Sequence, residues 1–203
     1  MSSTVNRKNK LKEIIESDEI RSWCRLEGQN TFTRNRKITC SDLLYLTLNN
    51  KSKTTSIEIR DYEKYLKGKS TVEYTDEAYL KQRRHLNPIV FKKLNMIFLN
   101  SFYNDTPDEV KTVKGYNLFG IDGSKYEVPN TPQNREYFGY QNNQSDDVTP
   151  ARTNTSSIYD LKNNFYCDVT IDKYTASEEE LAKRNIEQML EIIKDPQWEK
   201  SLN

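Results

Sequence analysis

The sequence predicts an α+β protein in which a helical front half is followed by a smaller region of strands and one helix. Up to Gly115, apolar residues recur at helical spacing, whereas beyond it they alternate as in strands. The charge balance changes at the same position, with 22 Lys and Arg against 15 Asp and Glu up to Gly115 and 9 against 15 after it. We therefore expect a helical region over residues 1–115 and a second region over residues 116–203.

Caps and chain breaks divide the front half into five predicted helices. Leu11, Ile14 and Ile15 have the i, i+3, i+4 spacing of one helix face. Thr75 is a candidate N-cap, and the two acidic residues after it favour the positive end of a helix dipole. The first four predicted helices cover residues 10–17, 42–48, 55–66 and 76–86, and the second of them has Thr39 or Ser41 as its cap. The fifth begins at Asn87-Pro88 and has Phe91, Leu94, Phe98 and Phe102 on its core face.

Three strands and a helix are predicted after Gly115. An apolar run at 116–121 predicts a buried strand that ends in Asp122-Gly123-Ser124. Residues 155–159 and 165–171 have the pattern of a hairpin, while residues 128–150 have the composition of a loop. The final predicted helix opens with a capping box from Ser177 to Glu180, and its apolar stripe consists of Ile186, Met189, Leu190 and Ile193.

Cysteine and histidine usage excludes several classes of protein. Three widely separated cysteines (Cys24, Cys40 and Cys167) without a CxxC pair argue against a zinc ribbon or a disulfide framework and are typical of a reducing cytoplasm. His85 is the single histidine, which excludes a His-rich metal site. The start of the chain lacks the apolar stretch of a signal peptide, and the apolar runs are too short to span a membrane. We expect a cytoplasmic protein without membrane association.

Two basic segments are candidate DNA contacts. The helix around residues 79–85, together with the helix at 55–66, is a candidate helix-turn-helix whose second helix enters the major groove. The segment at 32–39 has arginines that can hold phosphate oxygens in bidentate fashion. The alternatives are a solvated helix face for the first segment and a plain loop for the second. The candidate contacts are Arg34, Arg36, Lys37, Lys81, Arg83 and Arg84.

Asp122 is the candidate catalytic residue. A carboxylate at the end of an apolar strand, next to a glycine, can hold a hard cation near an incoming phosphate. In two-metal phosphoryl chemistry such carboxylates converge from several elements, so that one residue is not sufficient. The alternative is a turn, because Asp-Gly after a strand is a common turn signal.

Several segments, in order along the chain, resemble the DDE transposases of the insertion-sequence four family. The most specific is Gly120-Ile121-Asp122-Gly123-Ser124 followed by Val128-Pro129-Asn130-Thr131-Pro132. The other matching residues are Phe32, Arg34, Arg36-Lys37-Ile38-Thr39, Arg83-Arg84-His85-Leu86-Asn87-Pro88, Asn134-Arg135-Glu136-Tyr137-Phe138-Gly139, Ala151-Arg152, Tyr159-Asp160, Ser177 and Glu180-Leu181-Ala182. The resemblance therefore extends over nearly the whole chain.

The resemblance implies a helical DNA-binding region followed by a ribonuclease-H-like α/β core, built from a three-stranded meander and a helix. It aligns Asp122 with the first catalytic and metal-binding aspartate, which holds Mg²⁺ or Mn²⁺ in the complete enzyme. It implies double-stranded DNA at transposon ends as the partner, with a possible homodimer, and a bacterial, nucleoid-associated location. Arg152, near the expected sheet edge, joins the candidate DNA contacts.

The chain also departs from the family pattern. The resemblance predicts a second aspartate on the strand after the last helix and a glutamate further on, but the sequence printed ends at Asn203 and contains no Tyr-x-x-Arg-x-x-x-Glu spacing. Asp160, Asp168 and Asp172 are possible replacements, of which we expect Asp168 and Asp172 to be solvent-facing strand residues. The expectation is a truncated core that does not cleave DNA by itself. The alternatives are a non-catalytic DNA-binding relic or inhibitor, and a structural or interaction protein.

Overall fold

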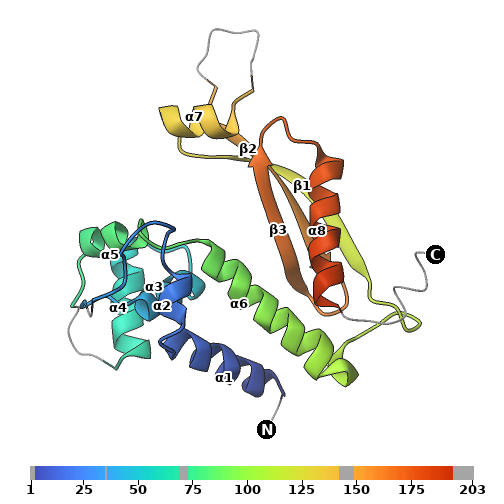
Figure 1. Cartoon of the computed structure of the whole chain (residues 1–203), viewed down its shortest axis with the longest axis horizontal. Coiled ribbons are helices and arrows are strands. Elements are labelled where there is room, and N and C mark those ends of the chain that lie inside the picture. The colour runs from blue at the N-terminus through green and yellow to red at the C-terminus, as the bar shows by residue number, and fades with distance from the viewer. Residues whose placement is uncertain (1–2, 35, 69–72, 142–148, 194–203) are drawn as a thin grey trace. The chain divides into compact units, whose positions relative to one another are not determined.

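The computed structural model describes residues 3–34, 36–68, 73–141 and 149–193, and it confirms the predicted α+β class (Figure 1). The chain forms two compact units, Met1–Leu94 and Asn95–Asn203. The division falls inside a helix, before Gly115, because Leu99, Phe102 and Tyr103 pack in one apolar cluster with residues of the strands. Within the described residues, no helix is long and apolar enough to cross a membrane.

The first unit is helical, as expected. It contains α1 (Ser3–Glu16), α2 (Ile20–Trp23), α3 (Cys40–Leu48), α4 (Thr55–Asp61) with a π-helical turn η1 (Tyr62–Leu66), α5 (Asp76–Arg83) and the start of α6 (Ile89–Asn100). The caps are confirmed, since Thr39 accepts from the backbone N–H of Asp42 and Thr75 from that of Ala78. Compared with the expected bounds, α1 begins earlier and α5 ends three residues sooner, at Arg83.

The core of this unit is centred on α3. Leu43 and Leu44 are completely buried, and Ile59 of α4 and Val90 of α6 are buried with them. Burial of each large aliphatic side chain contributes roughly 1.5–3 kcal/mol. This cluster therefore holds the helices together despite the polar composition of the chain.

A buried carboxylate, that of Asp42, links three parts of the first unit. Its Oδ1 accepts a hydrogen bond from the Tyr62 hydroxyl at 2.7 Å, and its Oδ2 accepts one from the Tyr74 hydroxyl at 3.0 Å. The Lys67 ammonium lies 2.6 Å from the same carboxylate. Burial acts to raise the pKa of Asp42, but the hydrogen bonds from Lys67, Thr39 and Tyr62 outweigh it and hold that pKa below its ordinary value.

The second unit is an antiparallel meander covered on one face by a helix. Strands β1 (Phe119–Glu127), β2 (Arg152–Asp160) and β3 (Phe165–Lys173) lie in the order β1-β2-β3. Helix α8 (Glu178–Ile192) lies along this sheet (Figure 1). The remaining elements are the π-helical turn η2 (Ser101–Asp105), the 3-10 turn η3 (Pro107–Glu109) and α7 (Pro132–Phe138).

Three predictions about the chain from the first strand to residue 150 were wrong. The first strand does not end there, because β1 begins at Phe119 and continues to Glu127, with Asp122 in its middle. It is also largely exposed, since β1 is an edge strand of the sheet. The segment predicted as a loop contains α7, which starts with Thr131 as a cap and Pro132 in the first turn.

The apolar stripe predicted for the last helix was also partly wrong. The residues of α8 that are buried are Leu181, Asn185, Met189 and Ile192, whereas Ile186 and Leu190 are exposed. The Nδ2 of Asn185 donates to Ser156 Oγ at 3.0 Å, and its Oδ1 accepts from the Thr170 hydroxyl. Ser177 precedes the helix, but its side chain makes no capping hydrogen bond, so the predicted capping box does not form.

We predict that Asp42→Asn lowers the free energy of unfolding by about 2–4 kcal/mol at pH 7, because it leaves the Lys67 ammonium and the tyrosine hydroxyls without their charged acceptor. Since the pKa of Asp42 is lowered on folding, its stabilisation is complete above the unfolded value of about 3.8 and is lost as the pH falls through the folded value. Urea unfolding followed by circular dichroism should show the two proteins converging below about pH 4.

The matched control is Asp61→Asn, which removes an exposed ion pair with Lys53 in the same unit. This variant should unfold almost as the wild type does, because exposed pairs contribute little. Equal effects of the two substitutions would contradict the role assigned to Asp42.

Candidate nucleic-acid interface

Three of the predicted DNA-contacting residues come together around one hollow in the first unit. Arg34 and Arg36 precede α3, and Lys81 lies on α5. The hollow has a volume of about 670 Å³. It is lined by Asn30, Thr31, Phe32, Thr33, Arg34, Arg36, Lys81, Gln82 and His85. Residues that are about 45 positions apart in the sequence thus form a single basic surface.

The core holds both walls of this hollow. Ile38 is 5% exposed and joins the apolar cluster, with Phe32 packed against the same cluster, so the segment that carries Arg34 and Arg36 is anchored on both sides. On α5, Tyr79 is 5% exposed and joins the core, while Lys81 is exposed. The cations therefore lie next to residues that are anchored in the core, and they remain accessible to a ligand.

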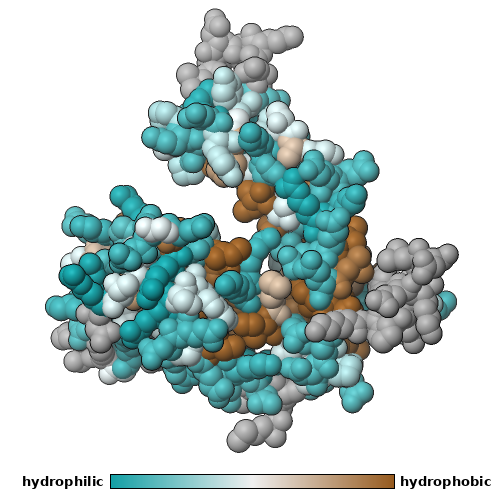
Figure 2. Space-filling model, viewed as in Figure 1, coloured by the Kyte–Doolittle hydropathy of each residue, from teal (hydrophilic) through white to brown (hydrophobic). Residues whose placement is uncertain are grey.

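Within the described chain the cations of the hollow are not held in ion pairs, although Glu16 and Asp18 line a neighbouring hollow together with Arg34 and Arg36. Among the residues that the structure describes, Arg34, Arg36 and Lys81 form no ion pair. By contrast, Arg152 lies 2.9 Å from Glu127 and also donates to the side chain of Gln141. Hydrophilic side chains cover most of the surface that is visible in Figure 2. The hollow is therefore better suited than Arg152 to bind an anion.

The other basic residues lie outside the hollow, and the predicted helix-turn-helix does not match the structure in full. Lys37, Arg83 and Arg84 are exposed but do not line the hollow. Ser56 at the start of α4 donates to Asp76 at the start of α5, so the two helices are neighbours. However, residues 67–75 separate η1 from α5, more than the roughly 3–4 residues of a helix-turn-helix. The two helices are therefore neighbours as predicted, but the segment that connects them is too long for a helix-turn-helix.

Asp122 is an exposed residue in the middle of β1, where it pairs across the sheet with Ser157. A Cβ on its neighbour Gly123 would lie 3.3 Å from Cδ of Glu178, the first residue of α8. Because successive strand residues point to opposite faces, Asp122 points away from α8. Within the described residues, no three His, Cys, Asp or Glu side chains are grouped to hold a metal ion.

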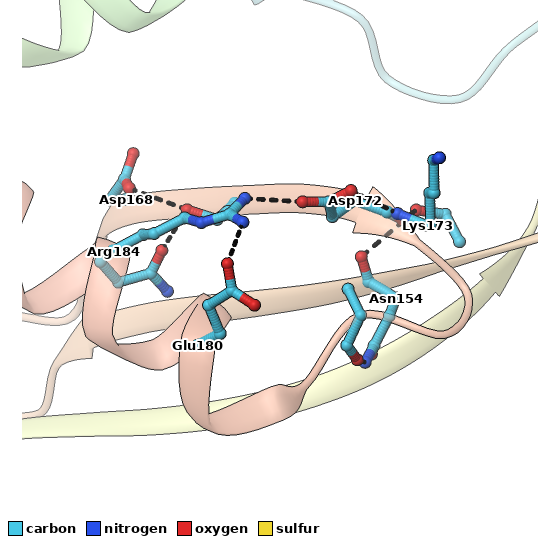
Figure 3. Close-up of polar contacts among 10 residues, drawn as sticks. Asn154, Asp168, Asp172, Lys173, Glu180 and Arg184 are labelled. Atoms are coloured by element: carbon cyan, nitrogen blue, oxygen red, sulfur yellow. Dashed lines mark hydrogen bonds and ion pairs between the residues drawn. The ribbon is translucent and has the colours of Figure 1, made fainter. Parts of the chain in front are cut away.

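The possible replacements for the missing carboxylates have other roles. Asp172 faces α8 and lies 2.6 Å from Arg184, which also contacts Glu180 at 2.6 Å (Figure 3). The backbone N–H of Lys173 and then Arg184 lower the pKa of Asp172. Asp168 lies on the same strand face and is only 7% exposed. The prediction that these residues face solvent was wrong for Asp168, which is buried, whereas the Asp172 side chain remains 30% exposed although it lies on the side of the sheet that α8 covers.

Asp160, the third possible replacement, has a structural role at the end of β2. It accepts hydrogen bonds from the Tyr103 hydroxyl at 2.6 Å and from the backbone N–H groups of Lys162 and Asn163 at 2.9 Å. These contacts shape the turn between β2 and β3. Burial, and then the contact with Asp160, raise the pKa of Tyr103.

No protein-family model, curated protein or solved structure matches this chain. Its function is therefore inferred from its own side chains and their geometry.

Proposed function

We propose that this protein binds double-stranded DNA through its helical unit and is part of a DDE-type transposase. The observation that carries the DNA-binding proposal is the convergence of Arg34, Arg36 and Lys81 around one hollow, with none of the three in an ion pair with a described residue. Phosphate contacts of this kind supply most of the sequence-independent affinity for DNA. The resemblance in the segments that contain Arg34, Arg36 and Asp122 supports the transposase assignment.

The basic side chains would contact DNA in different ways because their charged groups differ in shape. Guanidinium groups hold phosphate oxygens in bidentate fashion, whereas an ammonium acts as a point charge. Arg34 and Arg36 would thus orient the backbone, and Lys81 would add charge from the opposite wall. The exposed Lys37, Arg83 and Arg84 would contact neighbouring phosphates, with Arg152 in a minor role because of its ion pair with Glu127.

The catalytic part of the proposal assigns to Asp122 the role of the first metal-binding carboxylate. Transposition by such enzymes consists of phosphodiester hydrolysis and strand transfer, with Mg²⁺ or Mn²⁺ as the cofactor. The described residues do not fit a complete metal centre, because Asp122 offers a single carboxylate and the acidic residues of β3 face α8. This isolation favours, as a second candidate, a DNA-binding protein without catalytic activity of its own.

We predict that affinity for duplex DNA falls steeply with salt and that Arg34→Ala, Arg36→Ala and Lys81→Ala each weaken binding. Each substitution should reduce the slope of log K against log salt by about 0.9, the value for one lost phosphate contact. Fluorescence anisotropy with a labelled duplex between about 50 and 200 mM salt measures this slope.

Lys53→Ala is the matched control, because Lys53 is a cation of the same unit that is already paired with Asp61. Its slope should equal that of the wild type. A wild-type protein that shows no binding at any salt concentration would overturn the proposal and favour an interaction protein without a nucleic-acid role.

We also predict that the chain as given does not nick supercoiled plasmid DNA with Mg²⁺ or Mn²⁺, because Asp122 has no carboxylate partners among the described residues. Gel electrophoresis after incubation with each metal tests this. Metal-dependent nicking by the wild type that disappears in Asp122→Ala would show that a complete centre assembles. Nicking that persists in the variant would indicate a contaminating nuclease.

A further inference from the structure

Some of the groups that line the hollow beside α5 are not needed to bind a regular duplex. Besides its cations, it is lined by an aromatic ring from Phe32 and by amide side chains from Asn30 and Gln82. Its volume of about 670 Å³ falls within the range of roughly 300–1,000 Å³ that is typical of pockets for small ligands. Exposed cations alone would bind phosphates, so the other lining groups point to a ligand that also has a base.

The backbone of Phe32 has an uncommon conformation. Its φ is +56°, in the left-handed region that bulky residues rarely adopt. Its side chain also packs against the apolar cluster of the first unit, which fixes the ring beside the hollow. Such conformations concentrate at binding and catalytic sites, where the surrounding structure offsets their cost.

A second independent observation is an unsatisfied hydroxyl in the wall of the hollow. The Oγ1 atom of Thr31 is buried and has no hydrogen-bond partner. Most buried polar atoms are hydrogen-bonded, so this hydroxyl is an exception, and since its Oγ1 is closed off from solvent a ligand would reach it only after a small shift of the wall. Among the described residues, the side chains of Asn30 and Gln82 form no hydrogen bond, which leaves their amides available.

We propose that this hollow accepts a single unpaired nucleotide of the bound DNA. Arg34, Arg36 and Lys81 hold its phosphate, the ring of Phe32 stacks on its base, and the amides of Asn30 and Gln82 contact the base edge. The inference rests on the proposed DNA-binding function and adds the form of DNA that the site prefers. Unstacking a base costs least where it is already unpaired, so selectivity for such positions follows.

The test compares two duplexes that differ by one extra unpaired 2-aminopurine nucleotide. The wild type should bind the bulged duplex more tightly, and 2-aminopurine fluorescence should change on binding as the base stacks on Phe32. Phe32→Leu keeps an apolar side chain against the core but removes the ring, so it should weaken binding to the bulged duplex by roughly 5- to 100-fold. Binding to the regular duplex is measured in parallel, and its loss should be smaller than the loss for the bulged duplex.

Phe91→Leu is the matched control, because Phe91 is a partly buried phenylalanine that packs against the same cluster but does not line the hollow. It should leave the preference for the bulged duplex intact. If Phe32→Leu does not fold, as judged by circular dichroism, the double variant Asn30→Ala/Gln82→Ala replaces it. An unchanged preference in that variant overturns the inference, and a lost preference supports it.

The outcomes separate this inference from the function on which it rests. Equal affinity for the two duplexes, with the expected salt dependence, overturns the nucleotide site and leaves duplex binding in place. Absence of binding to either duplex overturns both.

Discussion

The arrangement of the first unit depends on one buried charge, the carboxylate of Asp42. Burying a carboxylate to 3% exposure is costly unless its oxygens are hydrogen-bonded, and here Tyr62, Tyr74 and Lys67 contact them. The same carboxylate closes the capping box of α3 with Thr39. It thereby joins the start of α3 to η1 and to the segment before α5. The two walls of the basic hollow come from the chain that enters α3 and from α5. This network therefore fixes the position of one wall relative to the other.

Local signals in the sequence predicted the helices well, because a cap acts within one turn. Thr39 and Thr75 cap the helices that follow them, as their side chains indicated. The local capping box predicted at Ser177 does not form, and the other errors discussed here arose where a distant segment decides the outcome. Asp-Gly at 122–123 resembles a turn, yet the chain stays extended because β2 pairs with it along its whole length. In α8, Asn185 replaces an apolar residue on the buried face because Ser156 and Thr170 satisfy its amide.

The candidate interface was predictable in composition but not in arrangement. Lys81 and Arg83 lie on the same short helix and have the same charge, yet only Lys81 lines the hollow. The cation of Arg152 is offset by Glu127 because the register pairs these two residues across β1 and β2. Neither the left-handed backbone of Phe32 nor the orphaned hydroxyl of Thr31 has a signal in the sequence, since both follow from packing.

The geometry of the sheet limits how Asp122 can contribute to catalysis. Gly123 faces Glu178, so Asp122 points to the opposite face of the sheet. The acidic residues on the α8 side are already engaged, as the contacts of Arg184 with Asp172 and Glu180 show (Figure 3). Bringing Asp172 to the side of Asp122 would require breaking its ion pair with Arg184 and turning β3 over, so that the side chain lies on the other face of the sheet. Any carboxylate that completes a metal centre with Asp122 must therefore approach the face of the sheet that α8 does not cover.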